Sequence, residues 1–349
     1  MVLPHGKGDL YHKYRPRRFG EVSGHKEIIK SIKQAVVAEE PAQAFVLTGD
    51  SGTGKTTTAR IMALALNCEQ LSKEGEPCLK CASCLAITTG KCTDLIEVNA
   101  ADHRGIGDIR ALCQSMPMMP LQLKTKVFIL DEAHQLTNDA QSSLLKELEE
   151  APSHVFIILC STHPKKIIPT IKTRCQKFTF STLSRREMLH LLEEVATLEG
   201  QDFPKKVYEA VVDSSGGSPR NGLVKLQQVF QLGSKNLSEI LKLLSGEEQK
   251  DPNIIKICFE LDSGYPKWAT LSKLYNECKH MGPGAIGMVI AGYYRNRLLK
   301  AKDANTGAHC ANILQEFVEP FPEGKLGENL LVLSLHKAFT KLARNSRGA

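Results

Sequence analysis

A glycine-rich segment with a single lysine is the first place where this sequence can do chemistry. The run GDSGTGKTT fits the pattern G-x-x-x-x-G-K-[ST] and lies between an expected strand and an expected helix. Glycines let backbone N–H groups turn toward a phosphate, and a helix N-terminus adds a favourable dipole. Lys55 is then expected to reach the β- and γ-phosphates of ATP, and the Thr56 hydroxyl to bind Mg²⁺. The predicted phosphate-binding residues are Gly49, Asp50, Ser51, Gly52, Thr53, Gly54, Lys55, Thr56 and Thr57.

Two neighbouring carboxylates end a strongly apolar run, VFILDEAH, at residues 127–134. Asp131 is suited to hold Mg²⁺, and Glu132 is suited to orient and polarise an attacking water. A buried acidic pair without a function would be costly, so simple helix capping is the weaker interpretation. The two segments together predict that the chain binds and hydrolyses ATP.

Five cysteines are concentrated between residues 68 and 92. Cys78, Cys81 and Cys84 form two overlapping C-x2-C steps, and either Cys68 or Cys92 can supply a fourth thiolate. Zn²⁺ takes four such ligands at about 2.3 Å, and a closed set of four leaves no position for a catalytic water. The spacing predicts a structural zinc site rather than unrelated free thiols. Five further cysteines are expected to be small buried hydrophobic residues: Cys113, Cys160, Cys258, Cys278 and Cys310.

Short apolar runs alternating with helical patterns must position these groups. Alternation of this kind with continuous apolar strands is typical of a parallel sheet covered on both faces, an α/β fold. One helix should begin near Thr137 and end at Ala151, because Pro152 disfavours helical geometry in the residue before it. The five expected strands are residues 44–49, 94–98, 126–132, 155–161 and 177–180.

From Leu183 onward the sequence predicts helices only. Ser184 and Glu187 form a capping-box pattern, and Ser218 precedes Pro219, which suits the first position of a helix. A polar stretch around residues 243–253 marks a further boundary. We therefore expect an α/β part at residues 1–182, with the cysteine module at 68–84, and helical parts at 183–246 and 247–349.

The bulk composition is that of an ordinary folded protein. The 349 residues are 42% hydrophobic and 24% charged, and the formal net charge is +7. This basic excess permits a polyanionic partner without requiring one. The N-terminus lacks the apolar core of a secretory signal, and no run approaches the ~18 apolar residues of a membrane span. We expect a soluble intracellular protein with reduced cysteines and no membrane partner.

The letters DEAH at residues 131–134 invite comparison with helicases. A helicase of that class needs a second nucleotide-binding domain that supplies arginines. Residues 183–349 contain neither a second strand–helix alternation nor a glycine-arginine-rich motif. The helicase interpretation is therefore disfavoured.

Several motifs in order resemble another family. They are YHKYRPRRFGEVSGHKEI (residues 11–28), the phosphate loop, DEAH, STHP (161–164), TRC (173–175) and GGSPRNGL (216–223). From Tyr11 to about Gly246 the sequence resembles the gamma/tau subunits of the bacterial DNA polymerase III clamp loader, within the AAA+ ATPases. The resemblance implies an AAA+ fold: a RecA-like sheet with a zinc-module insertion, an all-α lid and an all-α collar. It also implies that Val22 and Ile28 are apolar residues beside adenine.

The same resemblance assigns roles to single polar residues. Thr162 would contact the γ-phosphate or the attacking water, and Arg220 would reach the phosphates of its own site from the lid. Arg174 would act as a finger in the site of a neighbouring subunit, with Thr173 replacing the serine usual in that motif. Cys68, and not Cys92, would be the fourth zinc ligand.

For function, the resemblance implies an ATPase that opens and closes a sliding clamp on primer–template DNA. Copies of the chain and related subunits would form a pentamer in the cytoplasm, at the nucleoid-associated replisome. In ADHRGIGDIR, Arg104 and Gly105 are the candidate DNA contacts through charge and helix-start amides. The alternatives are another AAA+ machine, such as an initiator, branch-migration motor or stand-alone ATPase, and a mainly structural ATP-binding subunit.

Overall fold

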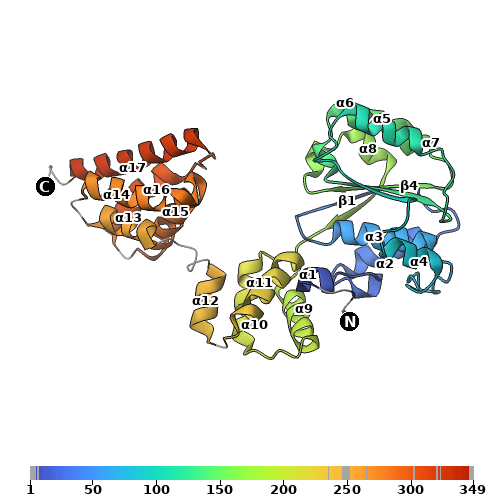
Figure 1. Ribbon diagram of the computed structural model, residues 1–349, viewed down its shortest axis with the longest axis horizontal. Helices are drawn as coiled ribbons and strands as arrows, with labels where there is room; N and C mark the ends of the chain where they lie inside the picture. Colours follow the sequence, from blue (N-terminus) through green and yellow to red (C-terminus); the bar gives the residue numbers. More distant parts are fainter. Residues whose placement is uncertain are drawn as a thin grey trace. The chain divides into compact units, whose positions relative to one another are not determined.

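A five-stranded parallel sheet forms the centre of the first half of the chain (Figure 1). The computed structural model describes His5 and residues 8–234, 236–245, 252–263, 266–301, 303–319, 321–322 and 324–345. The strand order is β2-β3-β4-β1-β5. The strands are β1 (Ala44–Gly49), β2 (Leu95–Asn99), β3 (Lys126–Asp131), β4 (Val155–Ser161) and β5 (Gln176–Phe180). All five predicted strands are confirmed, with ends shifted by one residue at most.

Two of these shifts have a local cause. β3 ends at Asp131 because Glu132 adopts a left-handed backbone conformation, with φ of 49°, which cannot continue a strand. β2 begins one residue later than predicted, after Asp94. The Asp94 carboxylate instead binds the segment that leads into β3.

Helices cover both faces of the sheet, as predicted (Figure 1). One face packs against α2 (Lys26–Val37) and α3 (Lys55–Asn67), and this core contains Ile32, Phe45 and Ile61. The other face packs against helices α5 to α8. These are α5 (Ile106–Ser115), α6 (Asn138–Ser143), α7 (Leu145–Glu150) and α8 (Pro169–Arg174). Both faces are apolar because each strand of a covered parallel sheet contacts helices on two sides.

The helix predicted between Thr137 and Ala151 is two helices in the structure. Thr137 is the N-cap of α6, and Ala151 is the C-cap of α7. Between them the Leu144 N–H bonds to the Gln141 carbonyl, only three residues back, which makes a tight turn. Leu144 is fully buried there, so a single apolar side chain fixes the junction against the sheet.

Four helices follow the sheet and have their own core. They are α9 (Arg185–Leu198), α10 (Lys205–Ser215), α11 (Pro219–Leu232) and α12 (Leu237–Ser245). The capping box of Ser184 and Glu187 is present at the start of α9, and Ser218 caps α11 with Pro219 at its first position. The short α1 (Leu10–Lys13) contributes Leu10 to this core, so the N-terminal segment connects these helices to the sheet.

The chain divides into two compact units, Met1–Leu244 and Ser245–Ala349. The second unit is helical and has a separate core that includes Cys258, Cys278 and Cys310. Its helices are α13 (Pro252–Asp262), α14 (Trp268–Cys278), α15 (Pro283–Lys300), α16 (Ala304–Leu314) and α17 (Lys325–Asn345). The described 3-10 helices of the two units are Phe19–Glu21, Ala133–Gln135, Pro164–Lys166, Lys279–Met281 and Gln315–Phe317. Among the described residues, no helix is both long and apolar enough to cross a membrane.

Four of the five isolated cysteines that were predicted to be buried are buried. Cys160 lies fully buried in β4, and the three cysteines of the second unit are also buried. The prediction is wrong for Cys113, which is only half-buried. It lies on α5, whose buried face is carried by Ile109, so the Cys113 side chain lies at the edge of the core.

Asp94 should be important for stability, because its buried carboxylate accepts the N–H groups of Leu121, Gln122 and Leu123 at 2.6–3.0 Å. Burial raises the pKa of Asp94, but these N–H donors outweigh burial and lower it overall. We expect Asp94→Asn to reduce the free energy of unfolding by about 1–3 kcal/mol at pH 7, because an amide leaves some donors unpaired.

Urea denaturation at several pH values measures this effect. The carboxylate contributes stability above its unfolded pKa of about 4, and that contribution disappears as the pH falls through the lowered folded pKa. The difference between wild type and variant should therefore shrink in acid. The exposed Asp139→Asn is the matched control, and an equal loss in both variants would contradict this role of Asp94.

Candidate nucleotide and metal sites

The phosphate loop connects β1 to α3 and requires glycine at two positions. Gly49 has φ of 142°, and a Cβ there would lie 2.1 Å from the Phe180 carbonyl oxygen. Gly52 has φ of 74°, and its Cβ would lie 2.3 Å from the Ser218 Oγ. The first contact joins the loop to β5, and the second joins it to the start of α11. The loop is therefore held between the sheet and the helices that follow it.

Lys55 is the first residue of α3, and its side chain turns back along the loop. Its Nζ donates hydrogen bonds to the carbonyl oxygens of Gly49 at 2.8 Å and Asp50 at 2.7 Å. Burial lowers the pKa of Lys55, and the nearby carboxylates of Asp131 and Glu132 oppose this shift. The ammonium group is thus placed at the loop, among oxygen acceptors.

Thr56 and Asp131 meet at the carboxyl end of β3. The Thr56 hydroxyl donates to Asp131 Oδ2 at 2.9 Å, and Asp131 Oδ1 accepts the N–H of Glu132 at 3.0 Å. A hydroxyl and a carboxylate beside a phosphate loop are oxygen ligands suited to Mg²⁺. The structure therefore brings together the two residues predicted to hold that ion.

Glu132 and Thr162 are also in contact, across the ends of β3 and β4. The Thr162 hydroxyl donates to Glu132 Oε2 at 2.9 Å. His134 Nδ1 lies 3.2 Å from the same oxygen, and the His134 ring lies 4.6 Å from that of His163. Burial lowers the pKa of His134, against the attraction of the Glu132 charge. The two histidines were not predicted, and nothing in their local spacing indicates that they meet.

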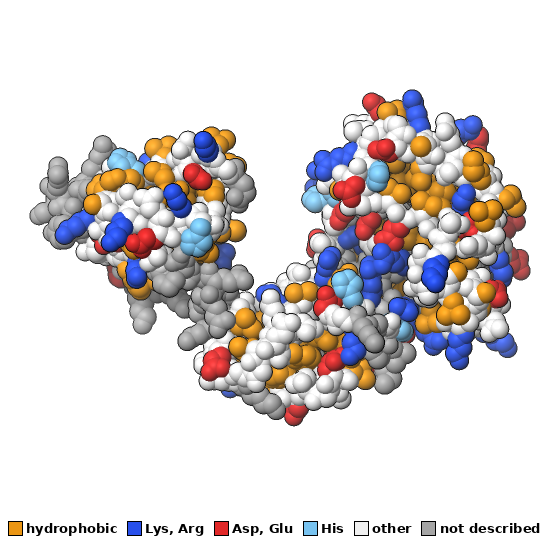
Figure 2. Space-filling view, viewed as in Figure 1, with side chains coloured by type: hydrophobic (Ala, Val, Ile, Leu, Met, Phe, Trp, Pro, Cys, Tyr) orange, Lys and Arg blue, Asp and Glu red, His pale blue; other side chains and the backbone are white. Residues whose placement is uncertain are grey.

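A cavity of about 140 Å³ lies between the phosphate loop and the helices after the sheet. Figure 2 shows Lys and Arg side chains gathered on this part of the first unit, beside acidic side chains. Predicted residues in its lining are Val22, Ser51, Gly52, Thr53, Gly54, Lys55, Thr56, Thr57, Asp131, Glu132 and Arg220. Ile28 does not line it and packs against the sheet core, and Gly49, Asp50, Thr162 and Arg174 are also outside the lining.

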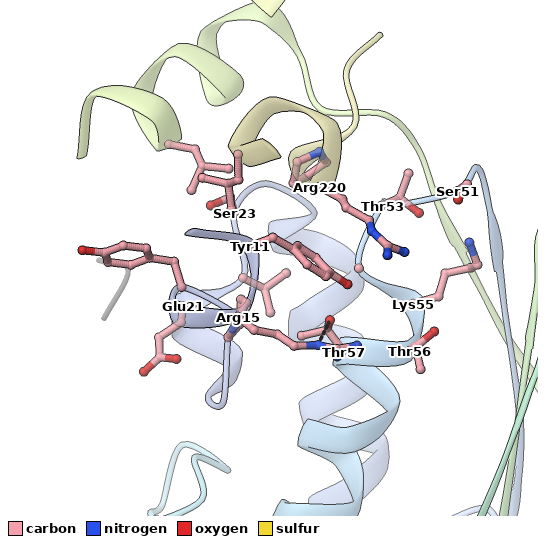
Figure 3. A pocket seen from close by; sticks show the side chains of 18 of the residues that line it. Tyr11, Arg15, Glu21, Ser23, Ser51, Thr53, Lys55, Thr56, Thr57 and Arg220 are labelled. Carbon is pink, nitrogen blue, oxygen red and sulfur yellow. Dashed lines mark hydrogen bonds between the residues drawn. The ribbon is translucent and has the colours of Figure 1, made fainter. Parts of the chain in front are cut away.

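The lining also includes residues to which the sequence analysis assigned no role. Tyr11, Tyr14, Arg15 and Pro16 come from the N-terminal segment, and Leu191 and Leu223 come from α9 and α11. The Arg220 guanidinium lies 4.7 Å from the centre of the Tyr11 ring, and that of Arg15 lies 5.7 Å from it (Figure 3). The segment containing Tyr11 and Arg15 was recognised as a motif, but its contacts depend on how α1 folds against the lid helices.

Arg174 lies away from the cavity, at the end of α8. Its guanidinium forms an ion pair with Glu149 of α7, and Nη1 donates to the Thr170 carbonyl at 2.9 Å. Both side chains of the ion pair are partly exposed. The chain therefore does not bring Arg174 to its own phosphate loop, and the role in a neighbouring site stays a prediction.

Arg104 and Gly105, the predicted DNA contacts, are exposed beside the start of α5. Gly105 is the N-cap residue of the helix, and Arg104 Nε donates to the Ala101 carbonyl at 2.8 Å. The loop is thus ordered by its own backbone. A role in binding DNA stays a prediction.

The sulfur atoms of Cys68, Cys78, Cys81 and Cys84 all lie within 4.8 Å of one another. Tetrahedral zinc with Zn–S bonds of about 2.3 Å separates its ligands by roughly 3.8 Å, so a small contraction would fit the ion. Cys92 is outside this group. The cluster runs from Cys68, the C-cap of α3, to Cys84 in the first turn of α4 (Ala82–Thr88), and its geometry is compatible with a zinc module at the predicted place.

Backbone N–H groups point at the sulfur atoms. The N–H of Cys78 bonds to Cys68 Sγ at 3.2 Å, and those of Lys80 and Cys81 bond to Cys78 Sγ at 3.3 Å. Burial raises the pKa of Cys78, but the N–H groups of Lys80 and Cys81, with hydrogen bonds to the Cys68 and Cys81 side chains, outweigh burial and lower the pKa to about 6. Burial raises the pKa of Cys84. A bound cation is what would hold all four side chains as thiolates.

Comparison with known proteins places the chain in a family. It is 39% identical to DNA polymerase III subunit gamma/tau of Mycoplasma pneumoniae over 66% of this chain and 34% of that protein. It is 35% identical to DNA polymerase III subunit tau of Bacillus subtilis over 67% of this chain and 41% of that protein. The chain thus spans about a third to two-fifths of these relatives. It is 30% identical to DNA polymerase III subunit gamma of Buchnera aphidicola subsp. Baizongia pistaciae, over 72% of this chain and 71% of that protein.

Two other comparisons agree with this result. Residues 24–184 match a family described as DNA polymerase III, delta subunit. Among solved structures, a RuvB variant from Thermotoga maritima matches with a TM-score of 0.51 and 18% identity, over 75% of this chain and 84% of that chain. The structural match concerns the fold alone and confirms the AAA+ architecture. By its sequence relatives, the chain belongs to the family of DNA polymerase III gamma/tau subunits.

Proposed function

We propose that this chain is an ATPase subunit of a sliding-clamp loader. The observation that carries the proposal is the arrangement of Lys55, the Thr56–Asp131 pair and Glu132 around one phosphate loop in a chain of the gamma/tau family. The chain would use ATP binding and hydrolysis to control a clamp on primer–template DNA. Its three proposed parts are the ATPase domain at 1–182, the lid at 183–246 and the collar at 247–349.

Each residue has a proposed role in hydrolysis. The Lys55 ammonium group would leave the carbonyl oxygens of the loop and donate its hydrogen bonds to β- and γ-phosphate oxygens. Thr56 and Asp131 would hold Mg²⁺. Bound Mg²⁺ would neutralise part of the negative charge on the phosphates. Glu132 would orient the attacking water, and Thr162, already bonded to Glu132, would fix that carboxylate or contact the γ-phosphate.

The size of the cavity links nucleotide binding to the lid. Small-molecule sites usually measure about 300–1,000 Å³, and the present cavity measures about 140 Å³. We infer that a nucleoside triphosphate widens the cavity, and Arg220 and Leu223 of α11 are lining residues that could move outward with the lid. Arg220 would leave the Tyr11 ring for a phosphate, so that the position of the lid depends on the bound nucleotide.

The four-cysteine cluster is proposed to hold a structural zinc ion. Its immediate surroundings are apolar and include Leu64, Ile87 and Leu123. The Glu76 carboxylate accepts the N–H groups of Phe19 and Gly20 at 2.8 and 2.9 Å. A folded module would thereby anchor the N-terminal segment that reaches the nucleotide cavity.

The proposed partners are those of a clamp loader. They comprise a sliding clamp, copies of this chain or related subunits in a pentamer, and primer–template DNA in the cytoplasm. Arg174 would complete the ATP site of a neighbour. Arg104 and the start of α5 would contact DNA phosphates, which suits binding without sequence preference.

Glu132→Gln should separate ATP binding from hydrolysis. The amide can still accept a hydrogen bond from Thr162 but cannot polarise water as a carboxylate does. We expect ATP turnover to fall at least about a hundredfold, with ATP affinity nearly unchanged. Phosphate release and binding of a fluorescent ATP analogue measure the two effects, with exposed Glu150→Gln as the control. Full turnover in Glu132→Gln would exclude this residue as the activating group.

The proposed function is tested by affinity capture from native extract with a non-hydrolysable ATP analogue. Lys55→Ala protein is the control, because it lacks the ammonium group expected on the phosphates. Recovery of a sliding clamp and loader subunits, identified by mass spectrometry and dependent on the analogue, is the expected result. Recovery of a different remodelling substrate would move the chain to another AAA+ function.

A further inference from the structure

A second, larger cavity lies on the other side of the N-terminal segment. Its volume is about 560 Å³, and among the described residues it is lined from α1, α3, the end of α4 and β2. Arg15, Pro16 and Thr57 line both this cavity and the nucleotide cavity. Arg15 Nε donates to the Thr57 hydroxyl at 3.1 Å (Figure 3). The two cavities therefore share a wall that contains this hydrogen-bonded pair.

The second cavity is strongly cationic. Its lining holds the guanidinium groups of Arg15, Arg17 and Arg60 and the imidazole of His12, against one carboxylate, Glu97. Arg60 already binds Glu97 through two hydrogen bonds of 2.7 Å. Three guanidinium groups minus one carboxylate leave a surplus of two positive charges. A concave cationic surface of this kind concentrates anions.

Arg15 and Arg17 have no carboxylate partner among the described residues, and Arg60, which binds Glu97 through Nε and Nη2, retains Nη1 for an anion. Arg15 Nε donates to the Thr57 hydroxyl, and no carboxylate of the described residues pairs with the Arg17 side chain, which lines the cavity. Burial lowers the pKa of Arg15, and the positive charge of Arg60 acts in the same direction. The guanidinium groups are thus crowded in a partly buried site, where a phosphate would relieve their repulsion and accept paired N–H bonds.

Apart from the hydroxyls of Thr57 and Thr88, most of the remaining lining is apolar and can contact the other half of a nucleotide. Ile61, Leu64 and Ile87 are buried side chains at the cavity, and Leu95 is half-buried. The volume lies within the range of about 300–1,000 Å³ that small-molecule sites occupy. A cationic edge beside an apolar wall matches a ligand with phosphates at one end and a flat base at the other.

We propose that this cavity binds a second nucleoside polyphosphate, with its phosphates on Arg15, Arg17 and Arg60 and its base against the apolar wall. Because Arg15 also lines the ATP cavity, occupancy of the second site would alter the position of Arg15 beside Thr57. The second ligand would therefore modulate nucleotide binding at the phosphate loop.

Equilibrium dialysis of the full chain with radiolabelled ADP, and separately GDP, tests the proposal. With ADP or GDP, wild type is expected to bind about two nucleotides per chain. The Arg17→Ala/Arg60→Ala double variant is expected to bind about one. Lys55→Ala should weaken the phosphate-loop site and leave the second site. Exposed Arg186→Ala is the matched control for charge. One nucleotide per chain in wild type, or two in the double variant, would overturn the second site without touching the proposed ATPase function.

Two further measurements need no cavity variant. Cys92 lines this cavity and is half-buried, so bound nucleotide should slow its alkylation by N-ethylmaleimide, followed by mass spectrometry. Inorganic tripolyphosphate should compete with nucleotide at this site. Protection of Cys92 by tripolyphosphate but by neither nucleotide would contradict the proposal that the apolar wall binds a base. Protection by an acidic peptide alone would contradict the proposal that the ligand is a nucleotide.

Discussion

Replacing Arg174 with alanine is expected to lower ATP turnover by the assembled protein about a thousandfold, the effect of removing an arginine finger. ATP binding by the single chain should remain, because Arg174 does not line the nucleotide cavity. Phosphate release at saturating ATP, with DNA and clamp present, measures the loss. Lys172→Ala is the matched control, since it removes a positive charge from the same helix.

The expected loss depends on where Arg174 lies. It is the last residue of α8, partly exposed and paired with Glu149. An exposed ion pair of this kind contributes little to stability, about 0–1 kcal/mol, so Arg174→Ala should fold normally. For the same reason, the Arg174 guanidinium could leave Glu149 and bind a phosphate at little cost in free energy. Because Arg174 does not line the nucleotide cavity of its own chain, we expect it to act on ATP in another chain.

Mixing two inactive variants tests action between chains. Lys55→Ala protein lacks a working phosphate loop but retains Arg174, whereas Arg174→Ala protein has the opposite defect. If Arg174 acts on a neighbour, the mixture should recover part of the turnover that neither variant shows alone. Equal turnover in wild type and Arg174→Ala, or no recovery in mixed oligomers, would contradict the role.

Removing one cysteine of the cluster should have the largest effect on folding. Cys84→Ser is expected to lower zinc content from about one ion per chain to well below that value. Binding of structural zinc by four-ligand sites contributes about 10 kcal/mol or more to the folded state. The module should therefore unfold locally, which would expose Leu64 and Ile87, and the thermal midpoint of the first unit should fall.

Cys92→Ser is the matched control for this experiment. It removes a thiol from the same segment, but its sulfur lies outside the cluster of four. Zinc content by elemental analysis and thermal denaturation should both remain as in wild type. Normal zinc content in Cys84→Ser, or zinc lost equally from both variants, would contradict the assignment of the four ligands.

The sequence by itself determined the elements that depend only on residues close together along the chain. The five strands, the phosphate loop, the capping box of Ser184 and the three cysteines in C-x2-C spacing follow from patterns only a few residues long. The ends of β2 and β3 differ from the predicted ends by one residue, because the left-handed Glu132 and the hydrogen bonds of Asp94 depend on contacts that a short apolar run does not contain.

Only the tertiary structure decided which distant residues meet. Tyr11 lies beside Arg220, and Arg15 binds Thr57 between two cavities, because α1 folds between the lid helices and the phosphate loop. Glu149 faces Arg174 because the turn at Leu144 directs α7 toward α8. The physical reason is range: backbone preferences and side-chain periodicity act over a few residues, whereas these contacts follow from packing apolar faces distant in sequence.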